Sequence, residues 1–230
     1  MQGRHHLIGI KGTGMSALAC LLRDWGVEIS GSDVPAFVFT QLALEKREIA
    51  IQPFTASNVH GASTVVRSAA FGSDNPEVAE ASRLGLPLYT YPEYLGNLTA
   101  QRSTLCVSGT HGKTTTTGMV VAVWEAAGRD PSYIIGDGTG HGGAGQELVI
   151  EACEYRRHFL HYTPHHTVIL NIDFDHPDYF RDLSDTKEAF AAFAARTRDT
   201  VVAWGDDPDV REALQGVEQR VVYYGEGPGN

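Results

Sequence analysis

A short run of glycine, lysine and hydroxyl residues, SGTHGKTTT at positions 108–116, carries the most specific chemical signal in the chain. It follows an apolar run with strand character at residues 105–107 and leads into residues 114–127, whose apolar side chains recur at helical spacing. Backbone N–H groups in such a loop and the positive end of the following helix dipole bind phosphate oxygens, and a lysine adds a mobile charge. We therefore predict a nucleoside triphosphate site formed by Gly109, Thr110, His111, Gly112, Lys113, Thr114 and Thr115.

Acidic side chains follow two later apolar runs that also have strand character. Glu151 comes directly after residues 148–150, and the segment NIDFDHPDYF at 171–180 follows residues 168–170. Strand-end acids in an open α/β sheet lie beside the binding crevice, where Mg²⁺ could bridge phosphate oxygens. Because Mg²⁺ prefers oxygen ligands, residue chemistry alone ranks Asp173 or Asp175 above His176 as a ligand.

A second glycine-rich turn lies near the amino terminus, where residues 7–10 read as a strand and 15–25 as an apolar helix. Between them, Gly12 and Gly14, with Ala17, match the GxGxxG/A pattern. Asp33 follows about 20 residues later, where a dinucleotide-binding protein places the acid that binds ribose. Taken by itself, this segment predicts a Rossmann-type nucleotide site.

Composition excludes several classes of protein. The 230 residues are 42% hydrophobic and 20% charged, which is ordinary for a globular protein. A net charge of −10 argues against nucleic-acid binding, which depends on clustered Lys and Arg. The sequence lacks an apolar stretch of the roughly 18–20 residues that a membrane span requires, and it shows no secretory signal, so we expect a cytoplasmic protein with no membrane insertion. The odd set of Cys20, Cys106 and Cys153 contains no CxxC pair, and we interpret these cysteines as reduced core residues.

The remaining periodicity predicts an α/β fold with two domains. A Rossmann-like parallel-sheet domain spans residues 1–95, with strands at 7–10, 27–30, 64–68 and 86–89 and helices at 15–25, 40–47 and 76–84. A linker is predicted at residues 91–103, where Pro92, Gly96 and Asn97 interrupt the pattern. A P-loop-type α/β domain then covers residues 103–230, with later strands at 148–152, 167–172, 200–203 and 220–224 and helices at 185–197 and 208–214. Residues 136–145 contain six glycines, which suits either a flexible loop near a ligand or a plain surface loop.

The general phosphate-loop pattern GxxxxGK[ST] requires a glycine at the position of Val107. The loop resembles instead the shorter GTxGK[ST] loop of the Mur ligase family. The stretches EACE at 151–154 and NIDFDH at 171–176 resemble the EAxE and NIxxDH stretches of its UDP-N-acetylmuramate:L-alanine ligase branch. This resemblance implies ATP and Mg²⁺ as cofactors, with Thr114, Glu151 and His176 as metal ligands, and Lys113, Glu151 and His176 as the catalytic residues.

The amino-terminal segments GIKGTGMS at 9–16 and SGSD at 30–33 resemble the UDP-sugar-binding domain of the same branch. The glycine turn would then hold the diphosphate of UDP rather than that of NAD. The residues implied in binding UDP-N-acetylmuramate are Gly12, Thr13, Gly14, Met15, Ser16, Asp33 and Ser68.

The resemblance also implies a reaction. ATP would convert the lactoyl carboxylate of UDP-N-acetylmuramate to an acyl phosphate, which the amine of L-alanine would attack to form an amide. Family members carry a third domain after the ATP-binding one. We therefore expect this chain to be a fragment with an incomplete central domain and without the C-terminal family domain, in which ligation is lost.

Three other functions remain open at this point. A peptide-recycling ligase would join a tripeptide to the same sugar nucleotide, although EACEYRRHFL at 151–160 looks more like the alanine-adding branch. An NAD(P)-dependent dehydrogenase would use Gly12, Gly14 and Asp33 but would leave the phosphate loop unexplained. A non-catalytic nucleotide-binding module would bind ATP and the sugar nucleotide without turnover.

Overall fold

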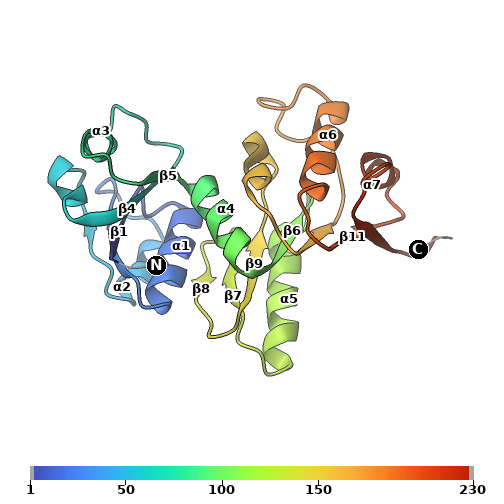
Figure 1. Cartoon of the computed structure of the whole chain (residues 1–230), viewed down its shortest axis with the longest axis horizontal. Helices are drawn as coiled ribbons and strands as arrows, with labels where there is room; N and C mark the ends of the chain where they lie inside the picture. Colours follow the sequence, from blue (N-terminus) through green and yellow to red (C-terminus); the bar gives the residue numbers. More distant parts are fainter. Residues whose placement is uncertain (1–2, 228–230) are drawn as a thin grey trace. The chain divides into compact units, whose positions relative to one another are not determined.

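The computed structural model describes residues 3–227. The chain divides into two compact units, one made of Met1–Tyr94 with Asp130–Gly145 and the other of Leu95–Arg129 with Gln146–Asn230. Figure 1 shows the order of the elements along the chain. The segment 130–145, predicted within the second domain, is thus grouped with the first unit.

The first unit contains a five-stranded sheet in the order β3-β2-β1-β4-β5, with every neighbouring pair parallel. The strands are β1 Arg4–Ile8, β2 Glu28–Ser32, β3 Ile51–Gln52, β4 Ala62–Arg67 and β5 Leu88–Thr90, and the helices are α1 Thr13–Asp24, α2 Gln41–Glu45, α3 Pro76–Arg83 and the 3₁₀ turn η1 Ala56–Val59. Sequence reasoning predicted four of these strands. The additional strand β3 has only two residues, too few for a visible alternation.

The glycine-rich segment forms part of a small antiparallel hairpin of β7 Ser132–Ile134 and β8 Gly140–His141. Both strands pack against α1. At Gly140 the hairpin backbone comes so close to the helix that a Cβ atom would meet the carbonyl oxygen of Ala17. The glycines therefore serve close packing, which neither predicted loop interpretation anticipated.

The second unit contains parallel strands in the order β12-β11-β10-β6-β9. These are β6 Ser103–Ser108, β9 Glu147–Glu151, β10 His166–Ile169, β11 Thr200–Trp204 and β12 Arg220–Tyr224; the helices are α5 Lys113–Ala126, α6 Leu183–Ala194, α7 Pro208–Ala213 and the 3₁₀ segment η2 Tyr155–His161. Helix α5 packs on β6 and β9. Phe159 stacks on Phe193 and meets Phe190 edge to face, which packs η2 against α6.

The segment predicted as a linker, 91–103, is helical over most of its length, because helix α4 spans Tyr91–Gln101. The boundary between the two units, at Tyr94 and Leu95, falls inside it. Pro92 lies in the first turn, where a missing N–H costs no helical hydrogen bond. Tyr94, Leu95, Leu98 and Thr99 are buried at helical spacing, so packing outweighs the glycine and asparagine between them.

The structure confirms the predicted α/β class, with a parallel sheet in the first unit and parallel strands around the phosphate loop in the second. Along residues 3–227, no helix has both the length and the apolar character that crossing a membrane would require.

Candidate active site

The phosphate loop connects the end of β6 to the start of α5, as predicted. Gly109 has φ +143° and Gly112 has φ +82°, a backbone region that residues with a side chain rarely adopt. Lys113 is the first residue of α5, so its own N–H group and those of the next residues have no acceptor within the helix. Val107 is buried in the middle of the sheet, opposite Glu151 on β9.

Asn171, just beyond β10, is hydrogen-bonded to the phosphate loop. Its Oδ1 accepts a hydrogen bond from the N–H of His111 at 2.7 Å, and its Nδ2 donates to the His111 carbonyl at 3.1 Å. The carbonyl of Asn171 also accepts the N–H of Thr110 at 3.1 Å. Sequence reasoning missed this role, although the position of Asn171 directly after an apolar strand was a usable signal.

The hydroxyl of Thr110 completes this attachment. It accepts the N–H of Asp173 at 2.8 Å and lies 3.2 Å from the carbonyl of the same residue. The side chains of His111 and Asp173 are both exposed, and their Nε2 and Oδ2 atoms are 3.7 Å apart. Asp173 therefore lies in the segment that is hydrogen-bonded to the phosphate loop.

Lys113 is tied to the loop and to a buried acid. Its Nζ donates to the carbonyls of Gly109 at 2.6 Å and Thr110 at 2.9 Å, and to Oε1 of Glu154 at 3.2 Å. The second oxygen of Glu154, Oε2, lies 3.0 Å from Nζ, within ion-pair distance. Glu154 is 1% exposed, and sequence reasoning did not select it.

Thr114 and Glu151 are brought into direct contact. The hydroxyl of Thr114 donates to Oε1 of Glu151 at 3.0 Å, joining the first turn of α5 to the end of β9. His176 also lies near Glu154, with its Nε2 3.7 Å from Oε1 of that residue. In the described part of the chain, no three His, Cys, Asp or Glu side chains are grouped as a metal site.

His176 has an unusual backbone for a residue with a side chain, with φ +56°. Its carbonyl accepts the N–H groups of Tyr179 and Phe180, and its ring packs on Tyr155 at 4.6 Å. The hydroxyl of Tyr155 donates to Asp178 at 2.7 Å and holds the pKa of that carboxyl below its ordinary value. Such backbone strain persists only where the surroundings impose it, and it is frequent at functional sites.

Thr115, which was predicted to be part of the ATP site, is exposed in the first turn of α5.

The glycine turn of the first unit forms the other predicted site. Gly12 and Thr13 are exposed at the start of α1, whereas Met15 and Ser16 are buried. The hydroxyl of Ser16 donates to the carbonyl of Thr13 at 3.0 Å, so this side chain closes the first turn of the helix. Any contact from Met15 or Ser16 to a ligand would therefore come from the backbone.

Asp33 is bound to the same turn. Its Oδ2 accepts the N–H of Lys11 and its Oδ1 the N–H of Val34, each at 2.7 Å. Ser68 follows β4, and a Cβ atom at Gly9 would lie 3.0 Å from the Cβ of Ser68. The turn, Asp33 and Ser68 thus meet at the carboxyl edge of the first sheet.

The described part of the first unit contains at least two cavities. The smaller, about 280 Å³, is lined by Lys11 and Asp33 together with Val34, Pro35, Gln41, Ile51, Gln52 and Pro53. The ammonium group of Lys11 donates to the carbonyls of Val34 and Ala36, both at 2.5 Å. This cavity adjoins the glycine turn through Lys11.

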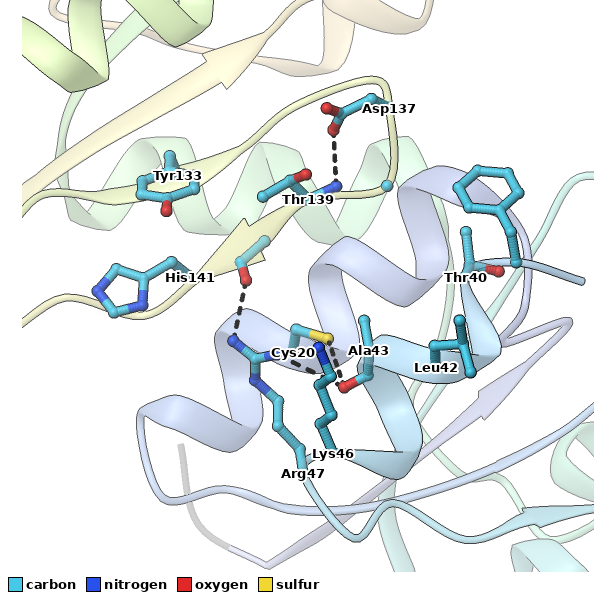
Figure 2. Close-up of a pocket in the computed structure, with 13 residues that line it drawn as sticks. Cys20, Thr40, Leu42, Ala43, Lys46, Arg47, Tyr133, Asp137, Thr139 and His141 are labelled. Atoms are coloured by element: carbon cyan, nitrogen blue, oxygen red, sulfur yellow. Dashed lines mark hydrogen bonds between the residues drawn. The ribbon is translucent and has the colours of Figure 1, made fainter.

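The larger cavity, about 370 Å³, lies between the hairpin, α1 and α2. Figure 2 shows Asp137 of the hairpin bonded to the N–H of Thr139, and Arg47 reaching the carbonyl of Gly140. Arg47 also pairs with Asp24 at 2.8 Å, and this pairing lowers the pKa of Asp24 against the opposing effect of burial. None of the predicted site residues lines this cavity.

Two family models together match nearly the whole chain. Residues 4–103 match the model of the Mur ligase family, catalytic domain, and residues 107–230 match the Mur ligase middle domain. The chain belongs to the Mur ligase family. Members of this family are ATP-dependent ligases that form amide bonds in peptidoglycan precursors.

Two solved structures are similar along nearly the whole chain. UDP-N-acetylmuramate:L-alanyl-gamma-D-glutamyl-meso-diaminopimelate ligase from Neisseria meningitides is 29% identical, with a TM-score of 0.86, covering 98% of this chain and 79% of that one. UDP-N-acetylmuramate-alanine ligase from Thermotoga maritima is 27% identical, with a TM-score of 0.81, covering 92% of this chain and 51% of that one. A murein peptide ligase from Psychrobacter arcticus shares the fold at 23% identity and a TM-score of 0.85, and the chain spans 53% of its length.

Proposed function

We propose that this chain supplies the ATP-binding and UDP-sugar-binding parts of a ligase that joins L-alanine to UDP-N-acetylmuramate. The observation that carries the proposal is the convergence of Lys113, Thr114 and Glu151 at the carboxyl ends of β6 and β9, beside the strained His176. A phosphate loop with acids at this edge suits phosphoryl transfer to a carboxylate.

The donor set fits Mg²⁺. Mg²⁺ is usually held by one or two protein oxygens together with substrate phosphates and water, so a closed group of three acids is not required. Thr114 and Glu151 offer adjacent oxygens, and His176 is the third residue that would hold the ion. When bound, Mg²⁺ would neutralise charge on the phosphate oxygens.

The chain's own groups have separable roles in this proposal. The N–H groups at the start of α5 and the ammonium group of Lys113 bind the phosphates of ATP, and His111 and Thr115 border them. Gly109, Thr110 and Gly112 shape the loop, which Asn171 fixes. The carboxylate of UDP-N-acetylmuramate attacks the γ-phosphorus and ADP leaves; the amine of L-alanine then displaces phosphate from the acyl phosphate, losing a proton.

In the first unit, the turn at Gly12–Gly14 is assigned to the diphosphate of UDP. The cavity beside Asp33 is assigned to the nucleoside, because it adjoins the turn and has a suitable volume of about 280 Å³. With Asp33 bound to two backbone N–H groups, we assign it to holding the turn rather than to carrying a free carboxylate. A cytoplasmic location remains the prediction from the sequence.

A second candidate is the ligase that attaches a tripeptide to the same sugar nucleotide. It is favoured by the 29% identity with the Neisseria ligase that acts on such a peptide. Both candidates share the ATP and sugar-nucleotide sites. An assay of amide formation with L-alanine and with the tripeptide as alternative acceptors separates them.

Thermal unfolding with ATP plus Mg²⁺, UDP-N-acetylmuramate or NADH in separate samples tests the common part of the proposal. A ligand that binds only the folded chain raises its apparent stability, by about 2.7 kcal/mol at 100 times its Kd. We expect stabilisation by the first two. Stabilisation by NADH alone would overturn the proposal in favour of a dehydrogenase, while binding of both ligands without amide formation would favour a nucleotide-binding module.

A further inference from the structure

Glu154 is a buried carboxylate to which the proposed chemistry gives no role. It lies between the end of β9 and the 3₁₀ segment η2, and its side chain is 2% exposed. A buried carboxylate is costly unless it is paired. Its partners are Lys113 and His176, two residues that the proposed function places at the nucleotide phosphates.

The hydrogen bonds of Lys113 leave no ammonium proton unused. A lysine has three donors, and Nζ donates hydrogen bonds to three acceptors, namely the carbonyls of Gly109 and Thr110 and Oε1 of Glu154, with Oε2 of Glu154 also at ion-pair distance. To donate to a phosphate, Lys113 must give up or share one of these bonds. Glu154 is the charged acceptor of the three and attracts the ammonium group most strongly.

We propose that Glu154 is a positioning residue that competes with nucleotide phosphates for the ammonium group of Lys113. The inference rests on the proposed role of Lys113 in binding ATP. Glu154 keeps the ammonium group at the base of the loop, and a bound triphosphate draws it outward. The released carboxylate lies near His176, whose Nε2 is 3.7 Å from Oε1.

This competition sets the direction of a mutational effect. Glu154→Gln keeps the shape of the side chain and removes its charge, so Lys113 moves to the phosphates at a smaller cost. We expect the affinity for ATP, with Mg²⁺ present, to rise about threefold to tenfold, a change on the scale of one charge interaction in a partly solvated site. Because loss of a negative charge alone also favours phosphate binding, competition further requires that the ammonium group of Lys113 change its position.

Isothermal titration calorimetry with ATP gives the affinities, and lysine-selective NMR gives the position of Lys113. The chain has four lysines, Lys11, Lys46, Lys113 and Lys187, so Lys113→Arg assigns its Cε signal by difference. We expect that signal to differ between wild type and Glu154→Gln without nucleotide, and ATP to shift it in the wild type. Asp199→Asn is the charge control, because it removes an exposed carboxylate before β11, at the edge of the sheet opposite the phosphate loop.

These measurements test the proposed role of Lys113 in binding ATP separately from the proposed competition by Glu154. If Lys113→Ala leaves ATP affinity unchanged and ATP does not move the Lys113 signal, the proposed role of Lys113 fails. If Lys113 responds in both tests but a folded Glu154→Gln binds ATP no tighter than wild type, competition by Glu154 is overturned. Should Glu154→Gln not fold, Glu154→Asp withdraws the carboxylate by one methylene; tighter ATP binding then supports the competition and unchanged or weaker binding overturns it.

Discussion

The hydroxyl of Thr114 donates a hydrogen bond to Oε1 of Glu151 at 3.0 Å, so the first turn of α5 and the end of β9 share one polar contact. Both oxygens are suitable ligands for Mg²⁺. Neither side chain is buried, so a cation and its waters have access to them. Substitution of either residue should therefore change the part of the ATP affinity that depends on Mg²⁺.

Glu151→Gln should weaken the binding of ATP in the presence of Mg²⁺ by about tenfold or more, which corresponds to about 1.4 kcal/mol. The reason is the loss of a charged oxygen ligand. Binding without Mg²⁺ should not weaken, because the change removes a negative charge near the phosphates. Titration calorimetry with Mg²⁺ and with a chelator measures both values.

Glu147→Gln is the matched control for this experiment. Glu147 is the first residue of the same strand, where it pairs with Arg129, and it lies at the end of β9 away from the loop. Its substitution should leave both affinities unchanged. An equal loss of ATP affinity with and without Mg²⁺ in Glu151→Gln would contradict a metal-binding role.

Lys113→Ala should abolish most of the ligase activity in a form of the protein that is active. Loss of a group that stabilises developing charge costs about 10²- to 10³-fold in rate. The rate of amide formation at saturating substrates measures it. Retention of more than about a tenth of the rate, a loss below ~1.4 kcal/mol, would exclude the proposed role.

The sequence predicted the strand, glycine loop and helix around residues 108–116 because local chemistry encodes them. Gly112 and Lys113 occupy the positions that the turn and the helix start require. Thr114 lies in the first turn of the helix and Glu151 is the last residue of a strand, so both positions could be read from the sequence. The contacts of Asn171 and Glu154 depend on which strands are neighbours. In the structure β6 lies between β9 and β10, an order that periodicity cannot give.

The errors of sequence reasoning have the same origin. Pro92 and Gly96 suggested a linker, but the buried face of α4 outweighs their local preferences. The glycines at 136–145 suggested a loop, which is present outside β8, but sequence did not show that close packing against α1 requires glycine at Gly140 and Gly142. In both segments the deciding contact is made with residues distant in sequence.

The requirement for glycine in the hairpin can be tested by mutation. A Cβ atom at Gly140 would overlap the carbonyl oxygen of Ala17. The backbone fixes the position of a Cβ atom and of a carbonyl oxygen, so neither can move aside by a change of rotamer. Gly140→Ala should therefore lower the free energy of unfolding by about 1–3 kcal/mol or more, as measured by chemical denaturation.

Gly118→Ala is its control, because Gly118 lies within α5 and a Cβ atom there meets nothing within 4 Å. That substitution should raise stability by up to about 1 kcal/mol, since alanine favours the helix. Fluorescence of Trp25, whose Nε1 bonds to Ser132 on β7 at 3.1 Å, reports on the hairpin directly. Equal stabilities of the two variants would show that the hairpin does not need glycine at this position.

A buried polar cluster in the first unit gives a prediction for acid stability. Glu77 is fully buried and accepts hydrogen bonds from His6, Ser32, the N–H of Thr55 and Asn58. Burial by itself would raise the pKa of Glu77, but these hydrogen bonds outweigh it and hold the pKa below its ordinary value. A carboxyl group with a lowered pKa in the folded state stabilises the fold above its unfolded pKa, about 4.3, and loses that contribution as pH falls.

The free energy of unfolding should accordingly fall between about pH 5 and pH 3 in the wild type, and less steeply in Glu77→Gln. The variant should also be less stable at neutral pH, because the amide cannot accept the full set of hydrogen bonds. Glu28→Gln, which removes an exposed carboxylate from β2 of the same unit, controls for net charge. Denaturation at several pH values measures the difference, and parallel curves for Glu77→Gln and the wild type would contradict the role of Glu77, since its proton uptake must then be the same in the folded and unfolded chain.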